Sequence, residues 1–243
     1  MFILNRSLPV ALLAAFLAAN APGATDSGPL KIIQTTELRL GDPGNAEIPR
    51  RGEVRVAILV DETGRLVDWL LLGYPHRAMA DAAISGLKEW RYEPATKHGQ
   101  AVGQRTIVRI EFESGGRVIS IRGGDAMDSL LGGRSGQSYV NRMAEQSELD
   151  HPLGVSEMSR PRFPAQLVGR GPEASSVLID FYVDEAGRPR MPVVLSSENS
   201  LFAMAALDAL DAWRFVPPTR KGQPVVVHVR QEFVFSNVGP DAS

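Results

Sequence analysis

The chain of 243 residues contains no cysteine, so it has neither disulfide bonds nor thiolate ligands for a metal ion. Its histidines are also few, and the four of them share no spacing that is typical of a metal site. The 28 Asp and Glu residues slightly outnumber the 26 Lys and Arg residues, which leaves no basic surplus for binding a nucleic-acid backbone. We therefore expect no metal, no other cofactor and no nucleic acid among the ligands of this protein.

Long hydrophobic runs are absent except near the amino terminus. There Arg6 precedes an apolar run at residues 8–19, which is shorter than the about 20 residues that a membrane-spanning helix needs. Ala19-Asn20-Ala21 follows and matches the A-x-A pattern of a cleavage site. We interpret residues 1–23 as an export signal. In the alternative, residues 7–21 are not cleaved and anchor the chain in a membrane, which would be its only association with a bilayer.

What the sequence does contain is an internal repeat. Trp90-Arg91-Tyr92-Glu93-Pro94 recurs as Trp213-Arg214-Phe215-Val216-Pro217, and the same shift of 123 residues aligns the flanking sequence without a gap. Between residues 61 and 102 roughly sixteen of forty-two pairs are identical. This similarity predicts two tandem copies of one small module.

Each copy is expected to begin with a strand and a tight turn. Residues 53–60 and 175–183 alternate between apolar and polar positions, as half-buried strands do. Both runs end in Asp-Glu-x-Gly-Arg, where the Asp side chain can accept hydrogen bonds from its own turn. Gly64 and Gly187 can adopt the positive φ that such a hairpin requires. A second strand is expected directly after each turn.

A helix follows the second strand in each copy. Small and apolar residues at helical spacing form a stripe that ends at Trp90 in the first copy and at Trp213 in the second. We expect both indole rings to pack the helix onto the sheet. Because proline cannot continue a helix, we expect Pro94 and Pro217 to end these two helices.

The predicted fold class is α+β, with two tandem small modules in the order strand, strand, helix, strand. Each module is expected to be a three-stranded antiparallel sheet with one main helix packed on it. We place the modules at residues 36–113 and 151–237. A Gly-rich stretch at residues 114–150 is predicted to be a flexible linker, with one short helix around residues 139–146, and to let the modules move separately. Residues 238–243 form a tail.

Residues with catalytic potential have simpler explanations. Asp61 and Asp184 are each explained by their turns and lie in separate copies, so they do not suggest a catalytic pair. The segment from Gly169 to Ala174 fits the pattern G-x-G-x-x-A, but it precedes a strand instead of linking a strand to a helix. No P-loop lysine and no nucleophile elbow occurs, and we expect the protein not to be an enzyme. The apolar run Trp69-Leu70-Leu71-Leu72 is either an interaction face of the first copy or packs against the amino-terminal segment.

These features together resemble a known family, the TonB C-terminal domain. The resemblance rests on the order of elements, the V-D-x-x-G-R turn, the small-residue helix ending in W-R-[YF]-x-P, and the alternating last strand. It covers both copies. The second copy is the closer match, because Arg160-Pro161-Arg162-Phe163-Pro164-Ala165 ahead of its first strand resembles the family's P-x-[YF]-P-x segment. The first copy departs from this pattern with Leu38-Arg39-Leu40-Gly41.

The resemblance implies a binding and force-transmitting module in transmembrane transport. TonB proteins are held in the inner membrane by an amino-terminal helix and cross the periplasm. Their carboxy-terminal domain pairs with a short strand of an outer-membrane transporter. The resemblance therefore implies a protein partner, either an outer-membrane transporter or another periplasmic protein, that is bound by strand addition.

The sequence itself indicates the same kind of contact. Alternating residues at 102–112 and 225–235 predict a last strand in each copy, which would leave a sheet edge whose N–H and C=O groups can pair with an added strand. We expect this edge to lie at residues 225–234 of the second copy. The predicted partner-binding residues are Val225, Val227, Val229, Gln231 and Phe233. Alternatively, the edge is covered by the other copy, by a second chain in a homodimer or by a loop.

Two features differ from the energy transducers of the family. The amino-terminal apolar run is short for a membrane anchor, and the linker is Gly-rich rather than a stiff Pro-rich spacer. We therefore expect an exported periplasmic protein, with an inner-membrane-anchored protein as the alternative. Without an anchor the chain would be an adaptor or structural module that has lost energy transduction.

Overall fold

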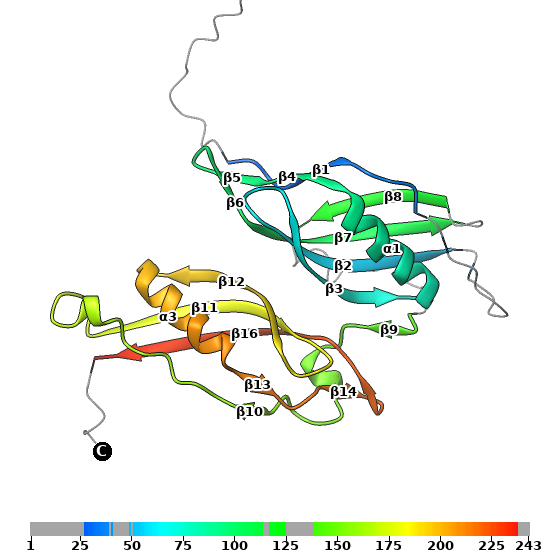
Figure 1. The fold of residues 1–243 in the computed structure, drawn as a ribbon. Helices are drawn as coiled ribbons and strands as arrows, with labels where there is room; N and C mark the ends of the chain where they lie inside the picture. Colours follow the sequence, from blue (N-terminus) through cyan, green and yellow to red (C-terminus); the bar gives the residue numbers. More distant parts are fainter. Residues whose placement is uncertain are drawn as a thin grey trace, which may run out of the picture.

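The computed structural model describes residues 27–38, 40, 49, 51–113, 117–124 and 139–237, and it contains two units of similar topology (Figure 1). The expected export signal at residues 1–23 and the tail at 238–243 lie outside these residues. Within them, no helix combines the length and the apolar character needed to cross a bilayer.

The first unit has one helix on a five-stranded sheet whose strand order is β8-β7-β2-β3-β9. Its main elements are β2 (Gly52–Val60), β3 (Leu66–Tyr74), α1 (Arg77–Glu89) and β7 (Gln104–Glu113). The additional strands are β1 (Lys31–Gln34), β4 (Arg91–Glu93), β5 (Ala95–Lys97), β6 (Gln100–Val102), β8 (Arg117–Gly124) and β9 (Asn141–Arg142).

The second unit has one helix on a three-stranded sheet whose strand order is β12-β11-β16. Its main elements are β11 (Ala174–Val183), β12 (Pro189–Ser197), α3 (Ser200–Asp211) and β16 (Val227–Ser236). Short elements complete it: the 3-10 helices η1 (Gln146–Glu148) and η2 (Ala165–Leu167), and the strands β10 (Val155–Glu157), β13 (Arg214–Phe215), β14 (Thr219–Arg220) and β15 (Gln223–Pro224).

The central ladder of the two sheets is the same after a shift of 123 residues. β2 and β7 pair antiparallel from Gly52↔Phe112 to Val60↔Gln104. β11 and β16 pair antiparallel from Ser175↔Phe235 to Val183↔Val227, which are the same positions after the shift. The predicted order of strand, strand, helix, strand and the α+β class are therefore confirmed.

The two predicted turns owe their shape to an aspartate and a glycine. Asp61 Oδ1 accepts hydrogen bonds from the backbone N–H of Thr63 and of Arg65, each at 2.9 Å, and Asp184 accepts the equivalent pair. The Thr63 hydroxyl also donates to Asp61, and these hydrogen bonds hold the pKa of this carboxyl below its usual range. Gly64 and Gly187 have φ values of 81° and 78°, where a side chain would be strained.

Both tryptophans lie just beyond their helices rather than in them. α1 ends one residue before Trp90 and α3 ends two residues before Trp213, yet both indoles are buried in the cores between helix and sheet, as predicted. The helices were expected to continue to the region of Pro94 and Pro217. They end earlier because residues 91–93 and 214–215 pair as strands with β1 and β10, and this extended pairing uses the backbone groups that a further helical turn would need.

The stretch between the two units differs from the linker that composition suggests. Residues 117–124 form β8 and pair with β7, and β9 pairs with the end of β3 through Gly73↔Arg142 and Tyr74↔Asn141. The short helix expected around residues 139–146 is absent, since these residues contain β9 and the start of η1. An open sheet edge offers N–H and C=O groups to any nearby extended segment, which explains why a Gly-rich stretch is recruited into the sheet.

The two units share a core instead of being independent modules. Each helix covers one face of its sheet, and residues of the other faces meet each other. This shared core contains Ala57, Leu70, Leu72 and Ile107 of the first unit and Tyr182, Met191 and Val226 of the second. Within the run Trp69-Leu70-Leu71-Leu72, alternate residues thus pack on the second unit, and Trp69 and Leu71 pack on the core of the first. Leu70 and Leu72 are therefore an interaction face of the first copy, as one of the two expectations had it, and this face contacts the second copy of the same chain.

Candidate functional site

The last strand of the second unit, β16, lies at an edge of its sheet, as the sequence predicts. Figure 1 shows it in red along one side of the second sheet, with β12 along the other. Among the described residues it pairs along its length only with β11. A single bridge between Ala144 and Val227 covers the beginning of its outer side.

The direction of the backbone groups along β16 can be read from its contacts. The carbonyls of Val226 and His228 accept hydrogen bonds from Ala144 N, at 2.9 Å, and from the side chain of Gln146, at 3.5 Å, so they point away from β11. In an antiparallel strand successive residues alternate in this respect. The even-numbered residues of β16 therefore direct their N–H and C=O groups outward, and the odd-numbered residues direct theirs toward β11.

The side chains of β16 alternate in the same way, and this changes which residues could contact a partner. Val225, Val227, Val229 and Phe233 belong to the core of the second unit, and Gln231 is half-buried. The partner-binding role predicted for these five residues stays a prediction, but their side chains face the helix and the backbone groups of the odd-numbered residues in β16 face β11. Contacts with an added strand would instead fall to even-numbered residues such as Glu232 and Val234.

Sequence reasoning located the edge but not its outward-facing residues. The alternation of residues 225–235 shows which side chains are apolar, and it says nothing about which backbone groups the neighbouring strand uses. That assignment depends on the register with β11. One signal for the outward-facing residues was present in the sequence: Val234 is apolar, whereas His228, Arg230 and Glu232 at the other even-numbered positions are polar or charged. In the structure Val234 is 68% exposed.

A buried carboxylate holds β16 against the first unit. Asp180 of β11 is only 2% exposed, and its Oδ1 lies 2.7 Å from His228 Nε2 and 2.9 Å from Arg230 Nε. Arg105, at the start of β7 in the first unit, pairs with its other oxygen. Burial alone would raise the pKa of Asp180, but the hydrogen bonds from His228, Arg105 and Arg230 outweigh burial and keep this pKa below its usual range.

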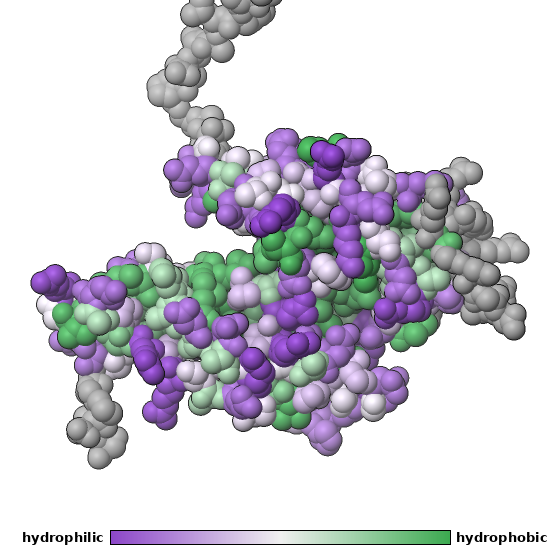
Figure 2. Space-filling model, in the orientation of Figure 1, coloured by the Kyte–Doolittle hydropathy of each residue, from purple (hydrophilic) through white to green (hydrophobic). Residues whose placement is uncertain are grey.

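The opposite edge of the second sheet is a poorer template for an added strand. β12 contains Pro189 and Pro192, which have no N–H group to donate. The space-filling view shows apolar surface gathered along β12 (Figure 2), and Leu195 on this strand is half-exposed. β16 contains no proline between Val227 and Ser236, so all of its outward N–H groups can pair.

The corresponding strand of the first unit, β7, is not an edge. β8 lies on its outer side and pairs with it from Ile107↔Gly124 to Glu113↔Arg117. Of the two equivalent edges, only the one in the second unit lacks a paired strand among the described residues. The sequence contained a weak signal for β8, the β-branched residues of Val118-Ile119-Ser120-Ile121, which the surrounding glycines obscured.

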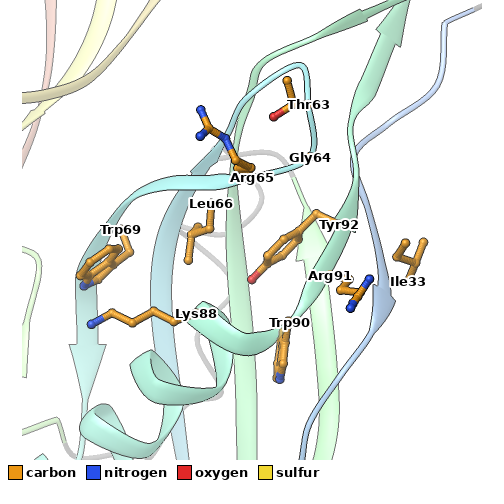
Figure 3. Close-up of a pocket in the computed structure, with 10 residues that line it drawn as sticks. All are labelled: Ile33, Thr63, Gly64, Arg65, Leu66, Trp69, Lys88, Trp90, Arg91 and Tyr92. Atoms are coloured by element: carbon orange, nitrogen blue, oxygen red, sulfur yellow. The ribbon is translucent and has the colours of Figure 1, made fainter.

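A cavity of about 470 Å³ lies in the first unit between the end of α1 and the turn after β2 (Figure 3). Leu66, Trp69, Lys88 and Tyr92 point into the same space, with the Lys88 ammonium 4.3 Å from the centre of the Trp69 ring. The Tyr92 hydroxyl donates to the carbonyl of Leu87 at 2.7 Å. The described residues that line this cavity include Arg65, Lys88 and Arg91 but no carboxylate and no histidine.

Metal ligation finds no support in the part of the chain that the structure describes. There, no group of three or more His, Cys, Asp or Glu side chains is arranged to hold a metal ion. Asp61 and Asp184, the only carboxylates singled out from the sequence, are occupied by their own turns.

The fold and the edge define a class of small α+β modules, each with one helix on an antiparallel sheet, of which the second has an edge strand left unpaired by the described residues. The family described as Gram-negative bacterial TonB protein C-terminal matches residues 46–114 and 159–236, which together are more than half of the chain. The protein therefore belongs to the TonB C-terminal family, whose domains are non-catalytic interaction modules of the cell envelope. Each matched segment contains the main strands and the helix of one structural unit, whereas β1, β8, β9, η1 and β10 lie outside the matched residues. No curated protein and no solved structure matches the chain.

Proposed function

We propose that this TonB-family protein binds an extended segment of an outer-membrane or periplasmic protein by strand addition to the outer side of β16. The observation that supports the proposal most directly is the edge itself. Beyond His228 no described strand pairs with the outer side of β16, and Glu232 and Val234 direct their backbone groups to that side. An added strand would extend the second sheet from three strands to four.

Backbone pairing alone would give weak binding. Each hydrogen bond contributes a net of about 0.5–1.5 kcal/mol, whereas ordering each residue of a flexible segment costs about 1–2 kcal/mol. Side chains must therefore add to the affinity. Val234 and Glu232 project on the same face of β16, so we expect the bound segment to carry an apolar residue opposite Val234 and a basic residue opposite Glu232.

The proposed location is the periplasm, after export directed by residues 1–23. If residues 7–21 were retained as an inner-membrane anchor, the chain could transmit force to the bound segment, as energy transducers of this family do. Without the anchor it would act as an adaptor or structural module. The shared core of the two units favours the adaptor, because the first unit then serves to support the second rather than to reach across the periplasm. Fractionation of cells and sequencing of the mature amino terminus distinguish the two cases.

The edge contact can be tested by photo-crosslinking in intact cells. A photoreactive residue at Val234 should form a crosslink that mass spectrometry maps to an extended segment of one envelope protein. Met204 on α3 is similarly exposed and is the matched control position. Substitution Glu232→Pro removes one outward N–H group and should abolish the crosslink, whereas Glu232→Ala should retain it. A crosslink that is unaffected by proline would show that the contact does not use the strand edge.

A further inference from the structure

The outer side of β7 in the first unit is the counterpart of the open edge of β16. After the shift of 123 residues, Arg109 corresponds to Glu232 and Glu111 corresponds to Val234. On β7 these positions are paired with the chain's own strand β8, through Arg109↔Arg122 and Glu111↔Ser120. Within the part of the chain that the structure describes, one such edge therefore carries a strand and the other does not.

We propose that the edge of β7 is a second strand-accepting site, and that residues 117–124 occupy it as an internal ligand. The native chain then presents a single open site, and removal of β8 from β7 would expose a second one. This inference concerns the first unit and does not require that β16 binds a partner.

The second unit shows that β8 is an addition to the fold rather than a part of it. β11 and β16 form their ladder of paired residues, from Ala174↔Ser236 to Val183↔Val227, and none of the described residues adds a fourth strand outside β16. With only these three strands in its sheet, the second unit already has its helix, its turn and its buried core. Since β2 and β7 form the same ladder, the first unit has what it needs to fold without β8.

The pairing of β8 also defines how the site would hold a segment. The ladder is antiparallel and runs from Ile107 to Glu113, with one irregularity between Glu111 and Phe112. By the alternation that β16 shows, Arg109 and Glu111 direct their backbone groups toward β8. The N–H group of Arg122 therefore faces β7, and that of the neighbouring Ile121 faces away.

The affinity of the β7 edge for a separate strand can be estimated from the covalent connection between β7 and β8. With an effective concentration of about 1 mM for a strand joined to its site by a short connection, a paired fraction of about 99% would correspond to a Kd of about 10 μM for the same strand supplied separately. Such an affinity is measurable with a synthetic peptide. The internal strand should compete with this peptide by about 100-fold, the ratio of the effective concentration to the Kd.

The test uses a labelled peptide with the sequence of residues 117–124 and a chain in which these residues are replaced by an equal number of glycines and serines. Both this chain and its control with native β8 carry Glu232→Pro, so that β16 does not contribute. Fluorescence anisotropy should show 1:1 binding to the replaced chain with a Kd of about 10 μM, and about 100-fold weaker binding to the control. A peptide with the substitution Arg122→Pro should show no measurable binding. A peptide with the substitution Ile121→Pro should still bind, with a Kd at least tenfold lower than any Kd found for the Arg122→Pro peptide.

Several results would overturn the inference. Equal binding to both chains would show that β8 does not occupy the site, and equal effects of the two proline substitutions would show that the contact is not the ladder seen here. Loss of the native circular dichroism spectrum in the replaced chain would show that β8 belongs to the fold. As a second route, the single substitution Arg122→Pro in the full chain should weaken β8 and make peptide binding detectable without replacement of the whole segment.

Discussion

Asp180 connects three parts of the molecule through one buried carboxylate. Its carboxylate pairs with Arg105 of the first unit and with both His228 and Arg230 of β16. The Arg105 side chain is 7% exposed, so its charge depends on Asp180 to be tolerated away from water. No sequence pattern indicated this contact, because Asp180 and Arg105 lie in different copies and each occupies an ordinary polar position of an alternating strand.

Substitution Asp180→Asn should therefore be among the costly single changes in this protein. It leaves Arg105 buried without its counter-charge, and breaking a buried pair in this way typically costs about 3–5 kcal/mol. Urea denaturation of the two chains measures the difference in free energy of unfolding. Asp81→Asn is the matched control, since its partner Arg77 is 66% exposed and such surface pairs contribute at most about 1 kcal/mol.

The same variant gives a pH dependence with a defined sign. The pKa of Asp180 is lower in the folded state than in the unfolded chain, so its contribution is present above the unfolded value of about 3.9 and is lost as the pH falls through the folded value. The stability difference between the native chain and Asp180→Asn should thus be constant near pH 7 and shrink below about pH 4. A difference that stays constant down to pH 2 would contradict the assignment.

At the scale of elements, local sequence patterns were sufficient to predict the main strands, turns and helices. They were not sufficient to predict β1, β8 and β10, the strands that pair beside them. Alternation and the Asp-Glu-x-Gly turn predict β2, β3, β11 and the start of β12, because period and turn chemistry are properties of adjacent residues. β8 was missed because its pairing is decided by an available edge rather than by its own composition. The early ends of α1 and α3 were missed for the same reason, since β1 and β10 lie far away in the sequence.

The occupied and open edges should differ in amide hydrogen exchange. The N–H groups of Arg109 and Glu111 face β8 and should exchange slowly, whereas those of Glu232 and Val234 face solvent. We expect the second pair to exchange at least about tenfold faster under native conditions, which corresponds to about 1.4 kcal/mol or more of additional protection for the first pair. Exchange read by NMR compares these equivalent positions in one sample, and equal rates would mean that β8 does not protect β7.

At the scale of the whole molecule, the two units form one cooperative body. Tyr182, Met191 and Val226 of the second unit are buried in a cluster that they share with residues of the first unit, and Asp180 is buried with Arg105 of the first unit as a partner. Separation of the units would expose this surface and take Asp180 away from Arg105, whereas Asp180 would keep His228 and Arg230 of its own unit. A sequence with an obvious repeat suggests independent modules, and the apolar residues Leu70 and Leu72 on the outer face of β3 were the sign that they are not.

We therefore expect a single unfolding transition for the full chain in urea, with the same midpoint by tryptophan fluorescence and by circular dichroism. A fragment of residues 139–237 should unfold at a distinctly lower urea concentration, because it lacks the apolar cover of the first unit. Two separate transitions in the full chain, or an unchanged midpoint for the fragment, would show that the shared core contributes little. Met191→Ala tests the same surface within the full chain and should cost about 2–5 kcal/mol.

The bridge between Ala144 and Val227 sets a limit on what the second unit can hold. The chain that enters this unit runs along the first residues of β16 and hydrogen-bonds to Val226, so a strand added further along must stop short of that point. The remaining length, from Arg230 to Ser236, spans about 20 Å at about 3.4 Å per residue. The edge would thus accept a segment of fixed length in one register. The part of the partner that continues beyond the end of this segment near Val227 would have to leave the sheet at that point.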